Sequence, residues 1–254
     1  SEEIYVGPAD RLVTPLDVLE TLPSVGEEVI YIVGTRGQKV TRIAGLEPWA
    51  DTLEELVLRS NLVGSMEGIE SLTKLTKLEL YDNQVEDVSH LDALVKLTVL
   101  DLSFNAIRSM APVAACPLLE ELYLAQNKLK VIEGIHDMVH LRCLDLGANR
   151  IRTMAGVGLE TLCNLQSLWL GKNKLECIND VEKLPKLRQL DCQNNRLTTL
   201  SWPGVDGAGI AACTALEELY LACNAIMTLD GIPRNCPLST VDLSTNGVES
   251  LEGA

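Results

Sequence analysis

Residues 75–105 read LTKLELYDNQVEDVSHLDALVKLTVLDLSFN, and one unit, L-x-x-L-x-L-x-x-N, is written twice within them. The first copy spans residues 75–83 and the second residues 97–105, so the two are offset by 22 residues. The unit continues in both directions along the chain, and its regular recurrence decides the fold. The asparagines that close the units are Asn61, Asn83, Asn105, Asn127, Asn149, Asn173, Asn195, Asn224 and Asn246.

The spacing inside the unit predicts its structure. Apolar residues that alternate with period two indicate a short strand with both leucines on one side. The asparagine follows where the chain turns, and its amide both donates and accepts, so we expect it to bond backbone groups of its own and the neighbouring turn. One turn buries little apolar surface, but stacked turns share a continuous core. A period of 22 residues is typical of leucine-rich repeats.

The predicted fold class is therefore an α/β solenoid. We expect a right-handed leucine-rich-repeat superhelix, or horseshoe, with a parallel concave β-sheet and short turns or 3₁₀ segments on the convex side.

The chain divides into two predicted regions. Residues 1–52 fit the repeat poorly, and we expect an N-terminal cap with a degenerate first repeat. Within it, residues 15–22 predict a short helix and residues 29–33 a strand that pairs with the first regular one. Residues 53–254 are predicted to hold about nine leucine-rich repeats, the last incomplete and without a C-terminal cap. Extra residues at 201–215 are expected to form a loop outside the strand face.

Composition limits the partners and the compartment. The chain has 254 residues, 46% of them hydrophobic, and a formal net charge of -15. A strongly acidic protein repels phosphate backbones, which argues against nucleic acid and favours a basic protein surface as partner. No apolar run is long enough to span a membrane, and no signal peptide is visible at the start. The eight cysteines do not suggest a disulfide framework, and we expect Cys192, which replaces a strand leucine, to be buried. The predicted location is cytoplasmic and nuclear.

The motifs of catalysis and metal binding are missing from the sequence. His136 and His140 are four residues apart, but no third ligand accompanies them in the spacing of a zinc site. The sequence contains neither a nucleophile elbow nor a phosphate-binding loop. We therefore predict no catalytic residue, no metal site and no cofactor.

The residues between the two strand leucines are expected to point away from the core, onto the concave face. Beginning at Val57, this row consists mainly of acids and large aromatics, and Glu55, Glu121 and Glu218 flank it. One interpretation is cross-strand packing by the aromatics and solubility from the acids. We favour the other, an interface in which aromatics give buried contact and acids attract a basic partner surface. The predicted partner-binding residues are Glu79, Asp101, Tyr123, Asp145, Trp169, Asp191, Tyr220 and Asp242.

Several segments resemble one known family in more than the repeat consensus. They are LELYDNQ (residues 78–84), LDLSFNAIR (100–108), LGANRIR (146–152), LGKNK (170–174) and NNRLT (194–198). In this order and spacing they resemble the leucine-rich-repeat regulatory subunit of protein phosphatase-1, called regulatory subunit 7 in animals.

This resemblance implies a non-catalytic scaffold that binds the protein phosphatase-1 catalytic subunit through its concave face. Its contact residues would fall here on Asp101, Tyr123, Asp145, Trp169 and Asp242. An alternative stays open, because related 22-residue repeats occur in adaptors of cytoskeletal complexes, such as an axonemal dynein light chain, and of ribonucleoprotein complexes, such as a spliceosomal subunit.

Overall fold

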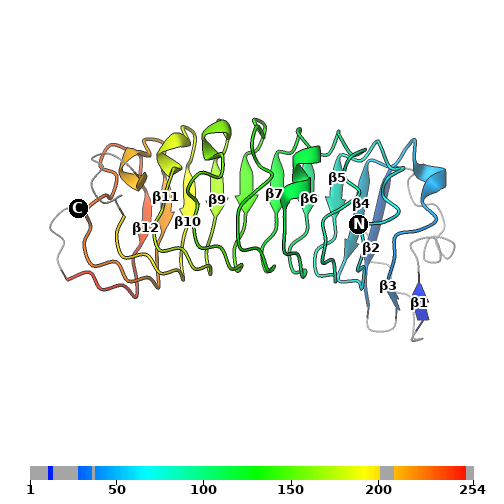
Figure 1. Cartoon of the computed structure of the whole chain (residues 1–254), viewed down its shortest axis with the longest axis horizontal. Coiled ribbons are helices and arrows are strands. Elements are labelled where there is room, and N and C mark those ends of the chain that lie inside the picture. Colours follow the sequence, from blue (N-terminus) through cyan, green and yellow to red (C-terminus); the bar gives the residue numbers. More distant parts are fainter. Residues whose placement is uncertain (1–10, 14–27, 36–37, 201–208, 250–254) are drawn as a thin grey trace. The chain divides into compact units, whose positions relative to one another are not determined.

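The structure, a computed structural model, describes residues 11–13, 28–35, 38–200 and 209–249. The chain splits into two compact units, residues 1–127 (unit 1) and residues 128–254 (unit 2), and each is described by itself. Both units are built from the same turn, a three- to five-residue strand followed by a return segment (Figure 1).

Unit 1 holds seven strands and two 3₁₀ segments among its described residues. They are β1 (Arg11–Val13), β2 (Val29–Val33), β3 (Gln38–Val40), η1 (Glu47–Trp49), β4 (Glu55–Arg59), β5 (Lys77–Glu79), β6 (Val99–Asp101), η2 (Ala111–Ala115) and β7 (Glu121–Tyr123).

The described part of unit 2 repeats the pattern with five strands and three 3₁₀ segments. They are β8 (Cys143–Asp145), η3 (Leu159–Thr161), β9 (Ser167–Trp169), η4 (Val181–Lys183), β10 (Gln189–Asp191), η5 (Gly209–Ala212), β11 (Glu218–Tyr220) and β12 (Thr240–Asp242).

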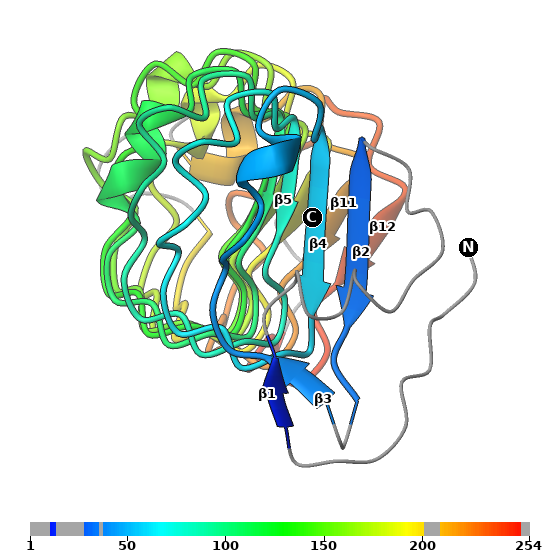
Figure 2. The ribbon, with the colours of Figure 1, turned by 90° about the vertical axis from the view of Figure 1, so that its right-hand side faces the viewer.

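Parallel pairing joins consecutive turns in register. In unit 1 the main sheet has the order β2-β4-β5-β6-β7, and in unit 2 the order is β8-β9-β10-β11-β12. Strand leucines align from turn to turn, as Leu78 with Leu100 and Leu190 with Leu219. A separate two-stranded sheet of β1 and β3 lies near β2 in unit 1 (Figure 2).

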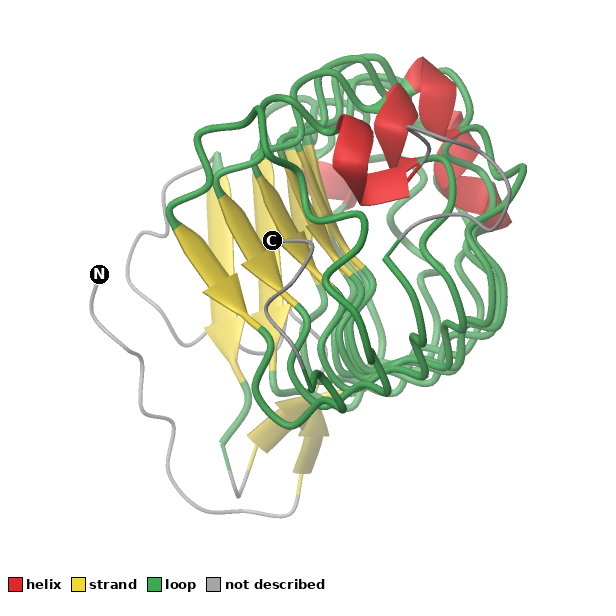
Figure 3. Cartoon of the chain, turned by 90° about the vertical axis from the view of Figure 1, so that its left-hand side faces the viewer, coloured by secondary structure: helices red, strands yellow, loops and turns green. Residues whose placement is uncertain are grey.

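The predicted parallel solenoid is confirmed. The strands of the main sheet line one side of each unit, and the 3₁₀ segments lie in the return segments away from that sheet (Figure 3). The consensus leucines fill the space between them; Leu78, Leu100, Leu144 and Leu168 are all 0% exposed. Because the sheet covers the core on one side only, its other side is an open face, and its side chains define the surface considered below.

The repeat asparagines join each turn to the preceding one, as predicted. In all nine, Oδ1 accepts the backbone N–H of the residue two positions after the preceding repeat asparagine, or of Val40 for Asn61, at 2.9–3.0 Å. Their amide nitrogens donate to backbone carbonyls, as from Asn173 to Leu146 of the preceding turn at 2.9 Å and to Leu170 of its own turn at 3.0 Å. One side chain thus satisfies polar groups that the interior of the stack would leave without water.

The residue before every repeat asparagine has left-handed backbone. Its φ lies between 51° and 58° in all nine turns, although none of these residues is glycine. The reversal of the chain at the strand end requires this conformation, which costs an L-residue roughly 1 kcal/mol. The nine residues are Ser60, Asp82, Phe104, Gln126, Ala148, Lys172, Asn194, Cys223 and Thr245.

The N-terminal region joins the repeat stack through its second strand. β2 pairs in parallel with β4, which confirms the predicted pairing, and Ile30 and Ile32 are buried against the core. Val40, Ile43 and Leu46 are also buried, like the return residues of a regular turn. The predicted helix at residues 15–22 lies outside the described residues, as do residues 201–208 of the insertion, whose next part forms η5. The division at residue 52 stays a prediction.

Replacing one interior asparagine tests the bonds between turns. We expect Asn173→Ala to lower the free energy of unfolding by about 2–4 kcal/mol, because the Ile151 N–H and the Leu146 carbonyl lose their partner inside the stack. Urea unfolding followed by circular dichroism measures the change. Asn235→Ala is the matched control, since this exposed asparagine should cost no more than about 0.5 kcal/mol. Equal losses in the two variants would contradict the role of the asparagine amide.

Candidate functional site

The register of the strands brings the predicted site residues into one row on the open face of each unit. In unit 1, Glu79, Asp101 and Tyr123 are consecutive Cα partners on β5, β6 and β7. In unit 2 the row runs across β8 to β12 as Asp145, Trp169, Asp191, Tyr220 and Asp242. We call these the unit 1 row and the unit 2 row.

The unit 1 row extends one strand further than the sequence analysis predicted, and one member is covered. Tyr31 pairs with Val57 and Val57 with Glu79, so Tyr31 belongs to the same row and is 48% exposed. Val57, predicted as an outward-facing residue, is only 1% exposed and contributes no surface. Tyr31 was missed because its strand lacks the repeat consensus; the alternation of residues 29–33 is the signal that could have found it.

Glu79 is neutralised within unit 1. Its Oε2 lies 2.7 Å from Arg59 Nε and its Oε1 lies 2.9 Å from Lys77 Nζ, and its side chain is 10% exposed. The hydrogen bond that Lys77 donates to the Glu79 carboxylate raises the pKa of Lys77. Arg59 also lies over the ring of Tyr81 at 5.4 Å, and the Tyr81 and Phe104 rings are 4.8 Å apart. These contacts hold both basic groups on the protein's own surface.

The aspartates of both rows have a local structural role that was not predicted. In each, Oδ1 accepts the backbone N–H of the residue two positions on, at 2.8–2.9 Å. This side-chain-to-backbone bond stabilises the turn at the end of the strand. From the sequence, these aspartates are predicted only as charges of the open face; an Asp two residues before the turn is the signal that indicates the bond. The pairs are Asp101–Ser103, Asp145–Gly147, Asp191–Gln193 and Asp242–Ser244.

Asp101 is the buried aspartate of the unit 1 row. It is 9% exposed, and burial raises the pKa of its carboxyl group, with a further contribution from the negative charge of Glu79. At the exposed end of the unit 2 row the effect is opposite, because the hydrogen bond from Ser244 lowers the pKa of Asp242. The two rows therefore place the same residue type in different electrostatic surroundings.

The aromatic residues of the unit 2 row are fixed by one connected set of side-chain bonds. Trp169 Nε1 donates to Gln189 Oε1 at 3.0 Å, and Gln189 Nε2 donates to Glu218 Oε2 at 2.7 Å. Tyr220 donates its hydroxyl proton to the same Glu218 oxygen at 2.9 Å. The flanking glutamate predicted from the sequence thus orients both aromatics. The unit 1 row repeats part of this arrangement, since Tyr123 donates to Glu121 at 2.8 Å.

The histidines and cysteines lie outside the two rows, although Cys143 lies in the strand that begins the unit 2 row. No group of three or more His, Cys, Asp or Glu side chains with metal-binding geometry occurs among the described residues. His136 contacts Asp137 at 2.7 Å. All eight cysteines are free, and burial raises the pKa of the Cys116 thiol to about 11 and that of Cys213 to about 12. Cys192 is fully buried, as predicted.

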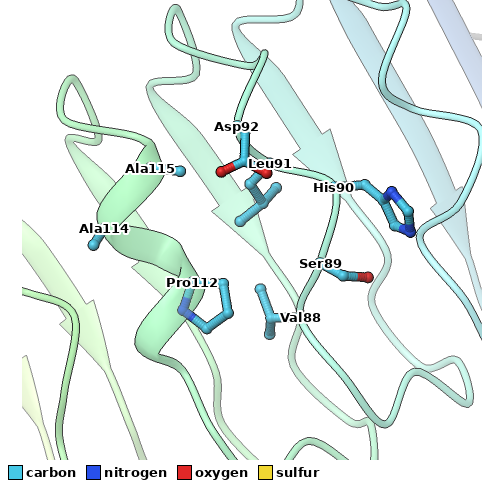
Figure 4. A pocket seen from close by; sticks show the side chains of 8 residues that line it. All are labelled: Val88, Ser89, His90, Leu91, Asp92, Pro112, Ala114 and Ala115. Carbon is cyan, nitrogen blue, oxygen red and sulfur yellow. The ribbon is translucent and has the colours of Figure 1, made fainter.

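A shallow hollow lies on the return side of unit 1, away from the open face (Figure 4). Its wall joins the segment around His90 to η2, and Pro112 and two alanines form much of it. None of the row residues lines it. The lining residues are Val88, Ser89, His90, Leu91, Asp92, Pro112, Ala114 and Ala115.

Each unit is a solenoid: its turns bury aligned leucines, are joined by asparagine amides and leave one face of the sheet open. Family profiles agree with this class. One described as "Leucine Rich repeats (2 copies)" matches residues 51–93, 73–115 and 163–204, and one described as "Leucine rich repeat" matches residues 96–151. The chain belongs to the leucine-rich-repeat proteins.

Among characterised proteins, the chain is similar to protein phosphatase 1 regulatory subunit SDS22 of Saccharomyces cerevisiae. The two are 44% identical over 59 residues, which cover 22% of this chain and 18% of the yeast protein. The match therefore spans less than a fifth of that relative. The repeat fold and this similarity to a regulatory subunit point to a non-catalytic protein. In the described residues, no helix has the length and apolar character needed to cross a membrane.

Solved structures support the fold. A Leptospira interrogans leucine-rich-repeat protein, LIC12759, superimposes with a TM-score of 0.73 at 25% identity, over 88% of this chain and 56% of that one. Internalin C2 of Listeria monocytogenes gives a TM-score of 0.60 at 27% identity, over 67% of this chain and 73% of the internalin.

The buried carboxyl of Asp101 predicts a pH-dependent effect of mutation. A folded-state pKa above the unfolded value means that the charged carboxylate weakens folding, and this cost grows as the pH rises through the window between the two values. Asp101→Asn removes the charge and can keep the bond to the Ser103 N–H. We therefore expect its free energy of unfolding, relative to wild type, to be higher at about pH 7 than at about pH 4.

Asp101→Ala separates the charge from the hydrogen bond. It loses the acceptor for the Ser103 N–H, and we expect it to be less stable than Asp101→Asn by about 1 kcal/mol. Urea unfolding of the three proteins at both pH values measures these differences. If Asp101→Asn gained more free energy of unfolding over wild type at about pH 4 than at about pH 7, a destabilising Asp101 charge would be contradicted.

Proposed function

We propose that this chain is a regulatory scaffold that binds the catalytic subunit of protein phosphatase 1 through the open face of its sheet. The observation that carries the proposal is the similarity of part of the chain to the yeast phosphatase regulatory subunit. The aromatics of the two rows support it, because aromatic residues are enriched at protein interfaces, and the acids support it because they attract a basic partner surface. The proposed contact residues are Glu79, Asp101, Tyr123, Asp145, Trp169, Asp191, Tyr220 and Asp242.

On this proposal the chain supplies shape and charge, while the phosphatase supplies the catalytic chemistry. The contact aromatics are half-buried and already held by side-chain hydrogen bonds, so they lose little conformational freedom on binding, which favours affinity. With a net charge of -15, the chain attracts a basic protein surface and repels nucleic acid and anionic membranes. We propose a cytoplasmic and nuclear location on the same basis as the partner.

Trp169 is the residue to test first. It lies between two aspartates in the unit 2 row, and its indole is oriented by Gln189. Central aromatic anchors of interfaces contribute about 2 kcal/mol or more, so we expect Trp169→Ala to weaken binding to the purified phosphatase 1 catalytic subunit about 30-fold. Isothermal titration calorimetry measures the change.

Trp49→Ala is the control, because Trp49 belongs to η1 in a return segment rather than to the open face (Figure 2). We expect its affinity to equal that of wild type. Full affinity of Trp169→Ala would remove this face from the proposal. A wild-type chain that does not bind the phosphatase but binds purified axonemal dynein or spliceosomal proteins would favour the adaptor function instead.

A further inference from the structure

The two rows differ in how their acids are balanced. In unit 1, Glu79 forms ion pairs with both Arg59 and Lys77, and Lys77 also lies 4.0 Å from Glu55. Arg59 is held further by the ring of Tyr81. A partner that approached this part of the face would have to break existing ion pairs before forming its own, and such an exchange gains little free energy.

The surroundings of Asp191 on the open face of unit 2 are different, because its Cα partners in the row are Trp169 and Tyr220 rather than basic residues. Three rows of side chains lie on the five described strands of unit 2 and the turns that follow them, and they contain acids but neither lysine nor arginine. The flanking row is Cys143, Ser167, Gln189, Glu218 and Thr240, and the row beyond the unit 2 row is Gly147, Gly171, Gln193, Ala222 and Ser244. Within these rows, a cationic side chain that complements Asp191 would come from another molecule.

Asp191 lies at the centre of this surface between two aromatic side chains. Its Cα partners are Trp169 on β9 and Tyr220 on β11, and adjacent strands are about 4.8 Å apart. The carboxylate rests against the neighbouring turn at Gly171, where a Cβ would come within 3.1–3.2 Å of its two oxygens. A glycine at this position provides the space that the carboxylate occupies. One oxygen is fixed by the Gln193 N–H at 2.8 Å.

The two aromatics beside Asp191 are held in place before any partner arrives. Their polar atoms are bonded through Gln189 and Glu218, whose carboxylate adds a second negative charge next to the site. Side chains that are already ordered lose less freedom on binding. An acid between two oriented aromatic rings combines the two features that attract a cationic side chain, a negative charge and π-faces.

We infer that the face of unit 2 docks a basic protein surface by receiving an arginine side chain at Asp191, between Trp169 and Tyr220. This inference rests on the proposed function and identifies which part of the face carries the charge recognition. Arginine fits better than lysine because its planar guanidinium pairs with a carboxylate through two N–H groups and also stacks on aromatic rings. Unit 1 contributes its aromatic contacts but little charge recognition.

The test compares the same isosteric change in the two rows. Asp191→Asn and Asp101→Asn each remove one charge and can keep the hydrogen bond to the following turn, so the fold is retained. With the phosphatase 1 catalytic subunit, we expect Asp191→Asn to weaken binding about tenfold or more and to reduce its salt dependence, as loss of a desolvated charge pair does. Asp101→Asn should lose less affinity than Asp191→Asn. Asp87→Asn, which changes an exposed residue of a return segment, should bind with the affinity of wild type.

A second probe separates this inference from the choice of partner. A tetra-arginine peptide, with tetra-lysine as comparison, is titrated into the chain while the indole N–H resonance of Trp169 is followed by NMR, assigned with Trp169→Phe. We expect a saturable shift with the arginine peptide that Asp191→Asn abolishes and Asp87→Asn retains.

Each outcome decides one of the two ideas. Wild-type binding to the phosphatase with equal losses from Asp191→Asn and Asp101→Asn would overturn the inference and leave the proposed function standing. Failure of wild type to bind the phosphatase would overturn the proposed function, and the peptide would then decide the inference alone. An indole resonance that the arginine peptide does not move in wild type would overturn the arginine site.

Discussion

The hydrogen bonds of the repeat asparagines are the constraint on which the rest of each unit depends. Most strands have only three residues, so the sheet pairs only a small part of the backbone of each repeat. The polar backbone groups that follow each strand need other partners. The Asn amide provides them in both directions, accepting from one turn and donating to the same turn and to its own. Once this bond fixes the distance and register between turns, the leucines stack and the outward residues form rows. The functional surface is thus a consequence of a structural bond that lies beneath it.

A second local bond links stability to the surface directly. In each aspartate of the rows, one carboxylate oxygen accepts the backbone N–H two residues later, where the chain reverses at the end of the same strand. The rest of the carboxylate lies on the open face. An acidic residue on this face therefore has two roles, and its presence alone does not show that it binds a partner. What distinguishes the positions is the neighbourhood, since Asp101 lies buried beside Glu79 and its basic partners, whereas Asp191 lies between Trp169 and Tyr220.

The fold and the alignment of the rows are predictable from the sequence because the signals that set them are local. Period-two leucines and a turn asparagine are local signals repeated nine times, so the fold, the buried core and the alignment of the rows follow from spacing. The contacts between side chains on different strands do not follow from this spacing. The ion pairs of Glu79 depend on the reach of Arg59 and Lys77 from neighbouring positions. Val57 is buried although its place in the row predicts exposure, and its Cα partner Tyr31 belongs to a strand without the consensus. The link from Trp169 through Gln189 and Glu218 to Tyr220 crosses three strands and has no signature in any one repeat.

The left-handed residue before each repeat asparagine has a consequence for how such a protein changes over time. The backbone there is set by the turn, and the nine side chains range from serine and alanine to lysine and phenylalanine. Phe104 at this position is 42% exposed, so its bulk does not enter the core. Each turn therefore includes one position whose side chain varies while the packing of the leucine core stays the same. Substitution at these positions would therefore alter the surface one turn at a time while the packed core beneath keeps its structure.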